Sequence, residues 1–138
     1  MRLKKIASNK KIFLGGTCAE STWREELIPL LTIEYFNPVV DDWNEEAQKN
    51  EIYEREHDDY VLYTITPRME GVYSIAEAVD DSNKRPDKTI FCLLEKDGDL
   101  TFTEGQLKSL KQVANMVKSN GGNIFFDLKD VANHVNKE

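Results

Sequence analysis

Short runs of consecutive apolar residues, separated by polar segments of helical length, constrain the fold of this chain most strongly. Three of these runs, at residues 11–14, 60–65 and 89–94, are apolar at successive rather than alternate positions. Strands that are buried on both faces have this pattern, and they are typical of parallel sheets covered by helices. The sequence therefore predicts an α/β fold.

The order of the predicted elements indicates a doubly wound sheet. Strands are expected at 11–14, 34–36, 60–65, 89–94 and 123–126, with a further short extended piece at 100–102. Helices are expected from 22 to about 31 (bent at Pro29), at 44–58, from 73 to about 83, at 104–119 and at 128–135. This alternation favours five parallel strands in the order 2-1-3-4-5, with right-handed crossovers. No repeat or linker interrupts it, so we expect one domain over residues 1–138, frayed at 1–9.

Charge and cysteine content narrow the classes of partner. The 138-residue chain has a net charge of -7, which disfavours nucleic acid and anionic membrane as partners because both need clustered Lys and Arg. No run approaches the ~20 apolar residues of a membrane span. Two cysteines, Cys18 in a predicted loop and Cys92 in a predicted strand, make no disulfide framework, and the basic start has no apolar run behind it. We therefore expect a cytoplasmic protein.

Polar residues follow the first predicted strand. Gly15, Gly16 and Thr17 offer backbone N–H groups and a hydroxyl that suit an anion or a sugar hydroxyl. The alternative is a tight turn that requires glycine. Neither a dinucleotide-binding nor a Walker glycine pattern is present to decide between the two.

A second polar loop follows the third strand and leads into a helix. The loop contains Thr66, Arg68, Glu70 and Gly71, and the helix opens with Tyr73 and Ser74 and carries Glu77. Arg68 suits a phosphate or carboxylate, and two carboxyl groups are the usual minimum for glycosyl transfer. The alternative is that Glu77 faces solvent and Arg68 pairs with Glu70. Because the first and third strands are neighbours in the predicted order, both loops should border one crevice.

The loop after the second strand contains Asn37, Asp41 and Trp43. An aromatic ring with an amide and a carboxylate suits a nucleobase, by stacking on its face and hydrogen bonding to its edge. The alternative is an Asx turn and a Trp in the core.

Other polar residues give weaker signals. The acidic run Glu45, Glu46, Glu51, Glu54, Glu56 and Asp58 is interpreted as a solvated helix face, although one member could point into the crevice. His57 and His134 have no metal-ligand spacing, so we expect neither a metal nor a cofactor.

Taken together, residues 11–17, 35–43, 59–67 and 71–77 resemble the nucleoside 2-deoxyribosyltransferase-like family, in particular its small bacterial and phage branch. The resemblance covers residues 10–135. It implies a flavodoxin-like (Rossmann-like) sheet of five parallel strands. It also implies cleavage or transfer of the N-glycosidic bond of a 2'-deoxynucleoside or its monophosphate. Homo-oligomers, dimers or larger, with sites near subunit interfaces are implied as well.

The chain departs from the family pattern at the expected nucleophile, a Glu on the helix after the third strand. Aligned on Gly71, that position falls on Ser74 or Ile75, and Glu77 follows about one turn later. The resemblance also implies an Asp just before the glycine of the preceding loop, which helps to bind the sugar or protonate the base. In this sequence that position falls near Glu70. The leading hypothesis is an enzyme with Glu77 as the catalytic carboxylate and Glu70 assisting. A non-catalytic nucleotide-binding module and a structural α/β domain are the alternatives.

Overall fold

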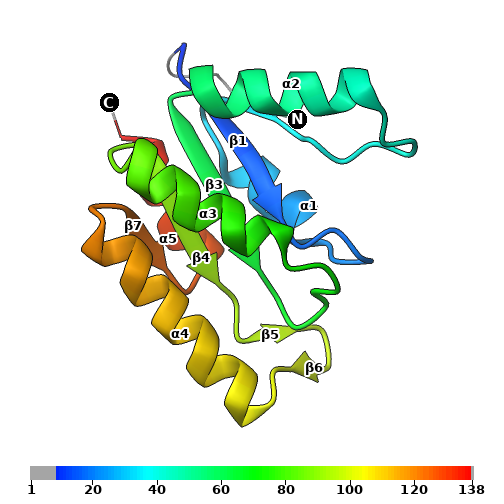
Figure 1. Cartoon of the computed structure of the whole chain (residues 1–138), viewed down its shortest axis with the longest axis vertical. Coiled ribbons are helices and arrows are strands. Elements are labelled where there is room, and N and C mark those ends of the chain that lie inside the picture. The colour runs from blue at the N-terminus through cyan, green and yellow to red at the C-terminus, as the bar shows by residue number, and fades with distance from the viewer. Residues whose placement is uncertain (1–8, 138) are drawn as a thin grey trace.

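A computed structural model describes residues 9–137 and contains one five-stranded parallel sheet (Figure 1). The sheet order is β2-β1-β3-β4-β7, and every pairing in it is parallel, which confirms the predicted order 2-1-3-4-5. The strands are β1 (Lys11–Gly16), β2 (Glu34–Phe36), β3 (Tyr60–Ile65), β4 (Thr89–Leu93) and β7 (Asn123–Phe125). The N-terminal segment 1–9 was predicted to be frayed, and its residues 1–8 lie outside the described residues.

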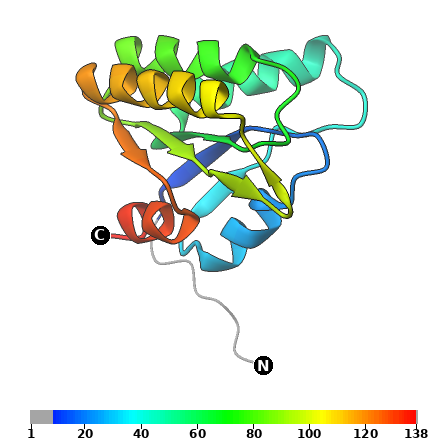
Figure 2. The same cartoon turned by 90° about the horizontal axis from the view of Figure 1, so that it is seen from below.

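Helices cover both faces of the sheet (Figure 2). On one face lie α2 (Glu45–His57), α3 (Tyr73–Lys84) and α4 (Glu104–Ser119), and on the other lie α1 (Trp23–Leu27) and α5 (Leu128–Val135). The predicted bend at Pro29 is a change of helix type, since α1 is followed by the 3₁₀ turn η1 (Ile28–Leu30). A small hairpin of β5 (Lys96–Asp97) and β6 (Leu100–Thr101) replaces the single extended piece that was expected.

Two hydrophobic clusters explain the consecutive apolar runs. Ile12, Leu62 and Ile90 pack toward α1 and α5, whereas the intervening Phe13 and Phe91 belong to the cluster under α3 and α4. All five side chains are buried, so both faces of the central strands are covered.

The α2 helix is attached differently from the other helices of its layer. Its only buried residue is Glu54, whose carboxylate lies 2.5 Å from Lys11 Nζ on β1. Asp58, the residue that follows α2, is also buried, so the prediction of a wholly solvated acidic face is wrong for these two residues. Burial and the nearby Glu54 carboxylate raise the pKa of Asp58 to about 7. Charges rather than apolar side chains therefore hold α2 against the sheet.

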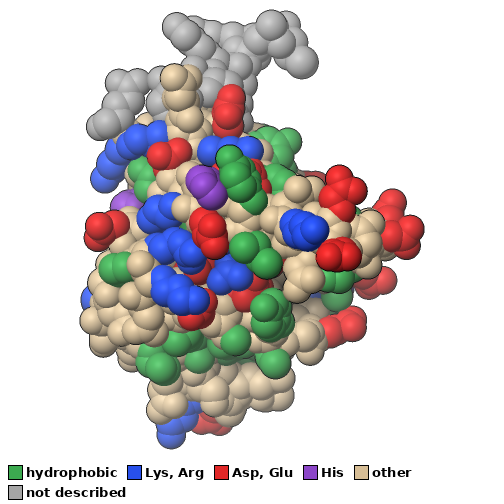
Figure 3. Space-filling model, turned by 45° about the horizontal axis from the view of Figure 1, so that its top comes forward, with side chains coloured by type: hydrophobic (Ala, Val, Ile, Leu, Met, Phe, Trp, Pro, Cys, Tyr) green, Lys and Arg blue, Asp and Glu red, His purple; other side chains and the backbone are tan. Residues whose placement is uncertain are grey.

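The surface on the side of α2 carries both signs of charge. Figure 3 shows Lys and Arg side chains toward the left and centre of this face, with some acidic side chains among them and further acidic side chains along its right edge. Ion pairs that contribute there include Lys84 with Asp80, at 2.9 Å. Within residues 9–137, no helix is both long and apolar enough to cross a bilayer.

Candidate functional site

A pocket of about 380 Å³ lies at the carboxyl end of β1, between α2 and the first turns of α3. Phe13 and Gly15 form part of its lining. A Cβ atom on Gly15 would come within 2.8 Å of the Phe13 ring and 2.9 Å of the Tyr63 ring, so a side chain there would meet both aromatic rings. Six residues predicted from the sequence line this pocket: Gly15, Gly16, Trp43, Tyr73, Ser74 and Glu77.

A second pocket of about 370 Å³ adjoins the first and shares Gly16, Tyr73 and Ser74 with it. Thr17, Glu70 and Gly71 complete the predicted residues that line it. The loops after β1 and β3 therefore border one continuous crevice, as expected at the point where the strand order reverses.

The loop after β1 is tightly fixed to β3. Gly16 has a φ of +120°, and a Cβ atom there would lie 2.0 Å from the Thr64 carbonyl oxygen. The Thr17 N–H donates to that same oxygen at 2.9 Å, and the Thr17 hydroxyl accepts from the Thr66 N–H at 3.0 Å. The tight-turn interpretation of the glycine pair is therefore correct for Gly16, whose backbone also faces both pockets.

Arg68 and Thr66 line neither of the two pockets. Arg68 Nε lies 3.3 Å from Asp97 Oδ1 on the hairpin, so the alternative in which Arg68 pairs with Glu70 is wrong. Thr66 is fully buried, and its hydroxyl accepts from the Arg68 N–H at 3.2 Å. Glu70 is exposed at the edge of the second pocket and does not line the pocket of Glu77.

The three residues predicted to frame a base are separated. Asn37 accepts a hydrogen bond from the Val39 N–H at 3.1 Å, which is the Asx turn of the alternative interpretation. Asp41 is exposed and lines neither pocket. Trp43 lines the first pocket and is 56% exposed, so the interpretation of Trp43 as a core residue is wrong.

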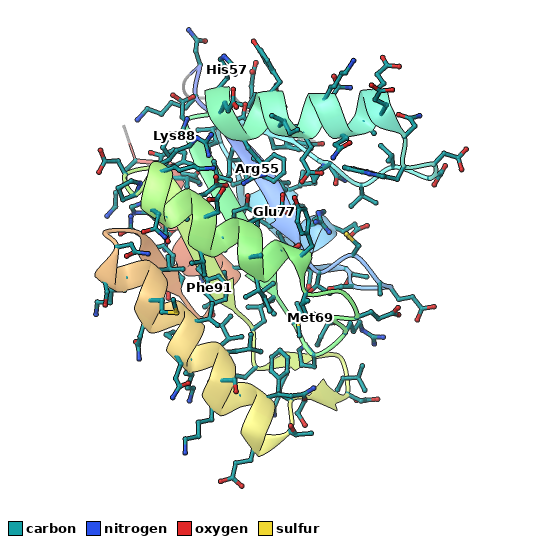
Figure 4. All side chains as sticks on the ribbon, viewed as in Figure 1. Arg55, His57, Met69, Glu77, Lys88 and Phe91 are labelled. Atoms are coloured by element: carbon teal, nitrogen blue, oxygen red, sulfur yellow. The ribbon has the colours of Figure 1, made fainter. Side chains whose placement is uncertain are left out.

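Glu77 is 7% exposed, so the alternative in which it faces solvent is wrong. Figure 4 shows Glu77 of α3 and Arg55 of α2 pointing toward each other across the gap between these helices. Glu77 Oε2 lies 3.1 Å from Arg55 Nη1. Burial, a hydrogen bond with the Glu51 carboxyl and the negative charge of Glu51 together raise the pKa of Glu77 to about 8. Two carboxyl groups with a nearby guanidinium therefore line one wall of the pocket.

The sequence analysis allowed one member of the acidic run to point into the crevice, and Glu51 of α2 does so, but neither Gln48 nor Arg55 was identified. Gln48, Glu51 and Arg55 are spaced three and four residues apart, so they share one side of the helix. Gln48 and Glu51 line the pocket, and Arg55 holds Glu77. This helical spacing indicates a shared face, but it could not be distinguished in the sequence because the segment contains many other charged residues.

Arg24 of α1 is a second missed residue. Its side chain is buried, lines the pocket, and donates through Nη1 to the Thr17 carbonyl at 2.8 Å and through Nε to the Leu14 carbonyl at 3.0 Å. Burial lowers its pKa. Arg24 therefore fixes the end of β1 and adds positive charge beside the pocket. Among residues 9–137, no group of three or more His, Cys, Asp or Glu side chains is arranged to hold a metal ion.

Comparison with known proteins gives one family. The family model described as "Nucleoside 2-deoxyribosyltransferase like" matches residues 9–96, well over half of the chain. The chain belongs to the nucleoside 2-deoxyribosyltransferase-like family. Every residue that lines the two pockets lies inside the matched segment. Membership of the nucleoside 2-deoxyribosyltransferase-like family suggests a nucleoside or nucleotide as the ligand. No curated protein matches the chain.

Proposed function

We propose that this protein cleaves or transfers the N-glycosidic bond of 2'-deoxynucleosides or their monophosphates in the pocket between α2 and α3. The observation that carries the proposal is the pair of carboxyl groups on the wall of that pocket, the buried Glu77 and the partly exposed Glu51. Family membership supports the same class of substrate.

The carboxyl pair supplies the two groups that this reaction requires. Because the pKa of Glu77 is raised to about 8, the Glu51–Glu77 pair carries one proton near neutral pH. When the bond between C1' and the base breaks, its electron pair leaves with the base, and the protonated carboxyl donates to the base. The ionised carboxyl attacks C1' directly or takes a proton from an attacking water.

The remaining pocket residues have binding roles in this proposal. The exposed ring of Trp43 offers a stacking surface for the base, while Gly15, Gly16 and Ser74 line the space available to the sugar. Thr17 and Gly71, with Tyr73, line the adjoining pocket, which has room for the 5' end of the ligand. Asn37, Asp41 and Arg68 have no place in this set because their side chains lie elsewhere.

The experiment is a product assay on a panel of 2'-deoxynucleosides and their monophosphates, with and without a second free base. The wild type should release or exchange the base. Glu77→Gln and Glu51→Gln should each lower kcat by about 100-fold or more, because each removes one member of the acid–base pair. Glu70→Gln tests the second carboxylate suggested by the sequence and should change kcat by less than about 5-fold.

Glu45→Gln is the matched control, since Glu45 is an exposed residue of the same helix as Glu51. Unchanged turnover in Glu77→Gln would show that the carboxyl pair is not catalytic. A larger loss in Glu70→Gln than in Glu51→Gln would move the second role to the loop.

A non-catalytic nucleotide-binding module is the second candidate. The observation that favours it is Ser74, which lines the pocket where the family alignment expects the nucleophilic Glu. This alternative predicts that a nucleoside or nucleotide raises the melting temperature while no base is released.

A homo-oligomeric, cytoplasmic protein is part of the proposal because the family resemblance implies an assembly with sites near subunit interfaces. Sedimentation of the purified protein should give a dimer or a larger species. A monomer at all concentrations would contradict this expectation.

A further inference from the structure

A third carboxylate, Asp81, lies beneath the arginine that holds Glu77. Asp81 is fully buried and accepts hydrogen bonds from Arg55 Nε at 3.1 Å, from Arg55 Nη2 at 3.0 Å and from the Tyr63 hydroxyl at 2.6 Å. Arg85, one turn along α3, also contacts Asp81. A buried carboxylate with this many donors is fixed in place.

Arg55 connects Asp81 to the pocket. Two of its nitrogens bind Asp81, and the third, Nη1, lies 3.1 Å from Glu77. The rigid, planar guanidinium can bridge two carboxylates in this way, whereas a lysine would offer a single point of charge. The positive charge of Arg55 is therefore divided between Glu77, which lines the pocket, and Asp81, which does not.

We propose that Asp81 is a positioning residue that fixes Arg55 against Glu77 and takes up part of its charge, so that the Glu51–Glu77 pair keeps its proton. Without Asp81, Arg55 would be the counter-ion of Glu77 and would favour the ionised carboxylate. The catalytic consequence of this inference rests on the proposed function, but the electrostatic coupling does not.

The other charges around Glu77 agree with this assignment. Glu51 of α2 opposes ionisation of Glu77, and Arg55 favours it. Arg24 of α1 lines the same pocket, and the Tyr63 hydroxyl of β3 donates to Asp81 at 2.6 Å. On α3, Asp80 lies 3.7 Å from Arg55 but is half exposed, so solvent screens its charge more than that of Asp81.

The test compares Asp81→Asn with Asp80→Asn, two adjacent substitutions that remove the same charge. The side-chain carboxyl carbons are labelled with ¹³C at glutamate, the Glu77 signal is assigned with Glu77→Gln, and its titration is followed by NMR. Asp81→Asn should lower the midpoint of Glu77 by roughly one pH unit, and Asp80→Asn by less than roughly 0.3. Equal shifts, or no shift in Asp81→Asn, would overturn the inference.

Arg85→Gln provides a test that leaves the buried carboxylate in place. Without the Arg85 cation, Asp81 should interact more strongly with Arg55, so that Arg55 stabilises the Glu77 carboxylate less. The titration midpoint of Glu77 should therefore rise by roughly half a pH unit. Lys84→Gln, which removes the neighbouring charge that pairs with Asp80 instead, is its control and should leave the midpoint in place. If Asp81→Asn fails to fold by circular dichroism, an unchanged midpoint in Arg85→Gln would itself overturn the inference.

Kinetics separate this inference from the proposed function. If the enzyme turns over substrate, the pH profile of kcat/KM should shift with the NMR midpoint in both variants. A shifted midpoint in a protein without turnover would support the coupling and contradict the proposed function. If turnover depends on Glu77 but Asp81→Asn does not shift the titration midpoint of Glu77, the result would support the proposed function and contradict the coupling.

Discussion

At the scale of single residues, Gly16 is the glycine where an added side chain would meet the closest contact. Gly16→Ala would place a methyl group against the Thr64 carbonyl at a φ of +120°. We expect the free energy of unfolding to fall by about 3 kcal/mol or more, because a backbone atom cannot move aside as a side chain can. Urea denaturation measures the loss.

Gly71→Ala is the matched control in the other loop of the crevice. A Cβ atom on Gly71 would meet nothing within 4 Å, and Gly71 has no positive φ that would strain a side chain. The free energy of unfolding should change by less than about 0.5 kcal/mol. A loss at Gly71 as large as that at Gly16 would mean that the loop, rather than the contact with Thr64, sets the effect.

The raised pKa of Glu77 links stability to pH. In the folded protein the pKa is about 8, against 4.5 for an unperturbed Glu. The folded state therefore binds more protons than the unfolded state between these values, and the contribution of Glu77 to stability, complete below pH 4.5, is lost as the pH rises through about 8. Glu77→Gln should flatten the fall in unfolding free energy between pH 5.5 and 8, a slope that reaches about 1.4 kcal/mol per pH unit for one proton.

Urea midpoints at several pH values measure this slope. Asp58, with a pKa raised to about 7, contributes to the wild-type slope in the same direction, so the difference between wild type and Glu77→Gln isolates Glu77. Glu45→Gln should leave the slope unchanged because Glu45 is exposed. Identical slopes in the wild type and Glu77→Gln would refute the raised pKa.

Sequence reasoning identified Glu77, but it left open which acidic residue of α2 enters the crevice, and it did not identify Arg55. Glu77 was found because it follows a strand that ends at the switch point of the sheet, a position given by chain order alone. Glu51 and Arg55 lie on the helix of another crossover unit, and only the packing of α2 beside α3 brings them to Glu77. Their approach is a tertiary contact with no local signal beyond their helical spacing.

At the scale of elements, α2 is the helix whose attachment depends most on charge. Lys11 with Glu54 connects it to the sheet and Arg55 with Asp81 connects it to α3, while Ile52 and Tyr53 remain exposed. Ion pairs weaken with salt more than apolar contacts do. We expect the amide hydrogens of α2 to exchange faster than those of α4, and to exchange faster still in 1 M salt.

Hydrogen exchange followed by mass spectrometry measures this difference. The helix α4 is the internal control, because it buries the apolar side chains of Leu110, Ala114 and Val117. Equal protection of the two helices, insensitive to salt, would show that α2 is held by more than its ion pairs.

The strands and long helices were predictable because their apolar patterns are local. The run at 89–94 and the apolar positions of 104–119 each specify one element and one buried face. The two-residue strand β5 was missed because Lys96 and Asp97 carry no strand pattern, and Asp97 is held by Ser21 and Arg68 instead. The placement of α2 was not predictable, since it has no apolar face to indicate its neighbour.

At the scale of the whole molecule, the net charge makes solubility change with pH in the opposite direction to the contribution of Glu77 to stability. The chain carries a charge of -7 at pH 7, and its isoelectric point is about 4.9. Repulsion between molecules is therefore weakest near pH 5, where Glu77 is most stabilising. We expect a solubility minimum near pH 5, measured as soluble protein after centrifugation across pH 4–8. Equal solubility at pH 5 and pH 8 would contradict this expectation.

The strand order 2-1-3-4-5 followed from alternating elements and right-handed crossovers, which leave few arrangements of five parallel strands. The position of the crevice followed from that order. The chemistry of the crevice could not be predicted from the strand order, because its two carboxyl groups come from different helices. Glu77 lies on α3 and Glu51 on α2, and the placement of α2 was not predictable.

The weak burial of α2 has a consequence for how this protein can change over evolutionary time. Apart from Glu51, Glu54 and Arg55, a helix that contributes one buried residue to the fold can accept substitutions with little harm to the rest of the molecule. Gln48 faces the pocket from this helix without any role in the sheet. Variation there, natural or engineered, can therefore alter which ligand is accepted while the scaffold that carries Glu77 stays intact.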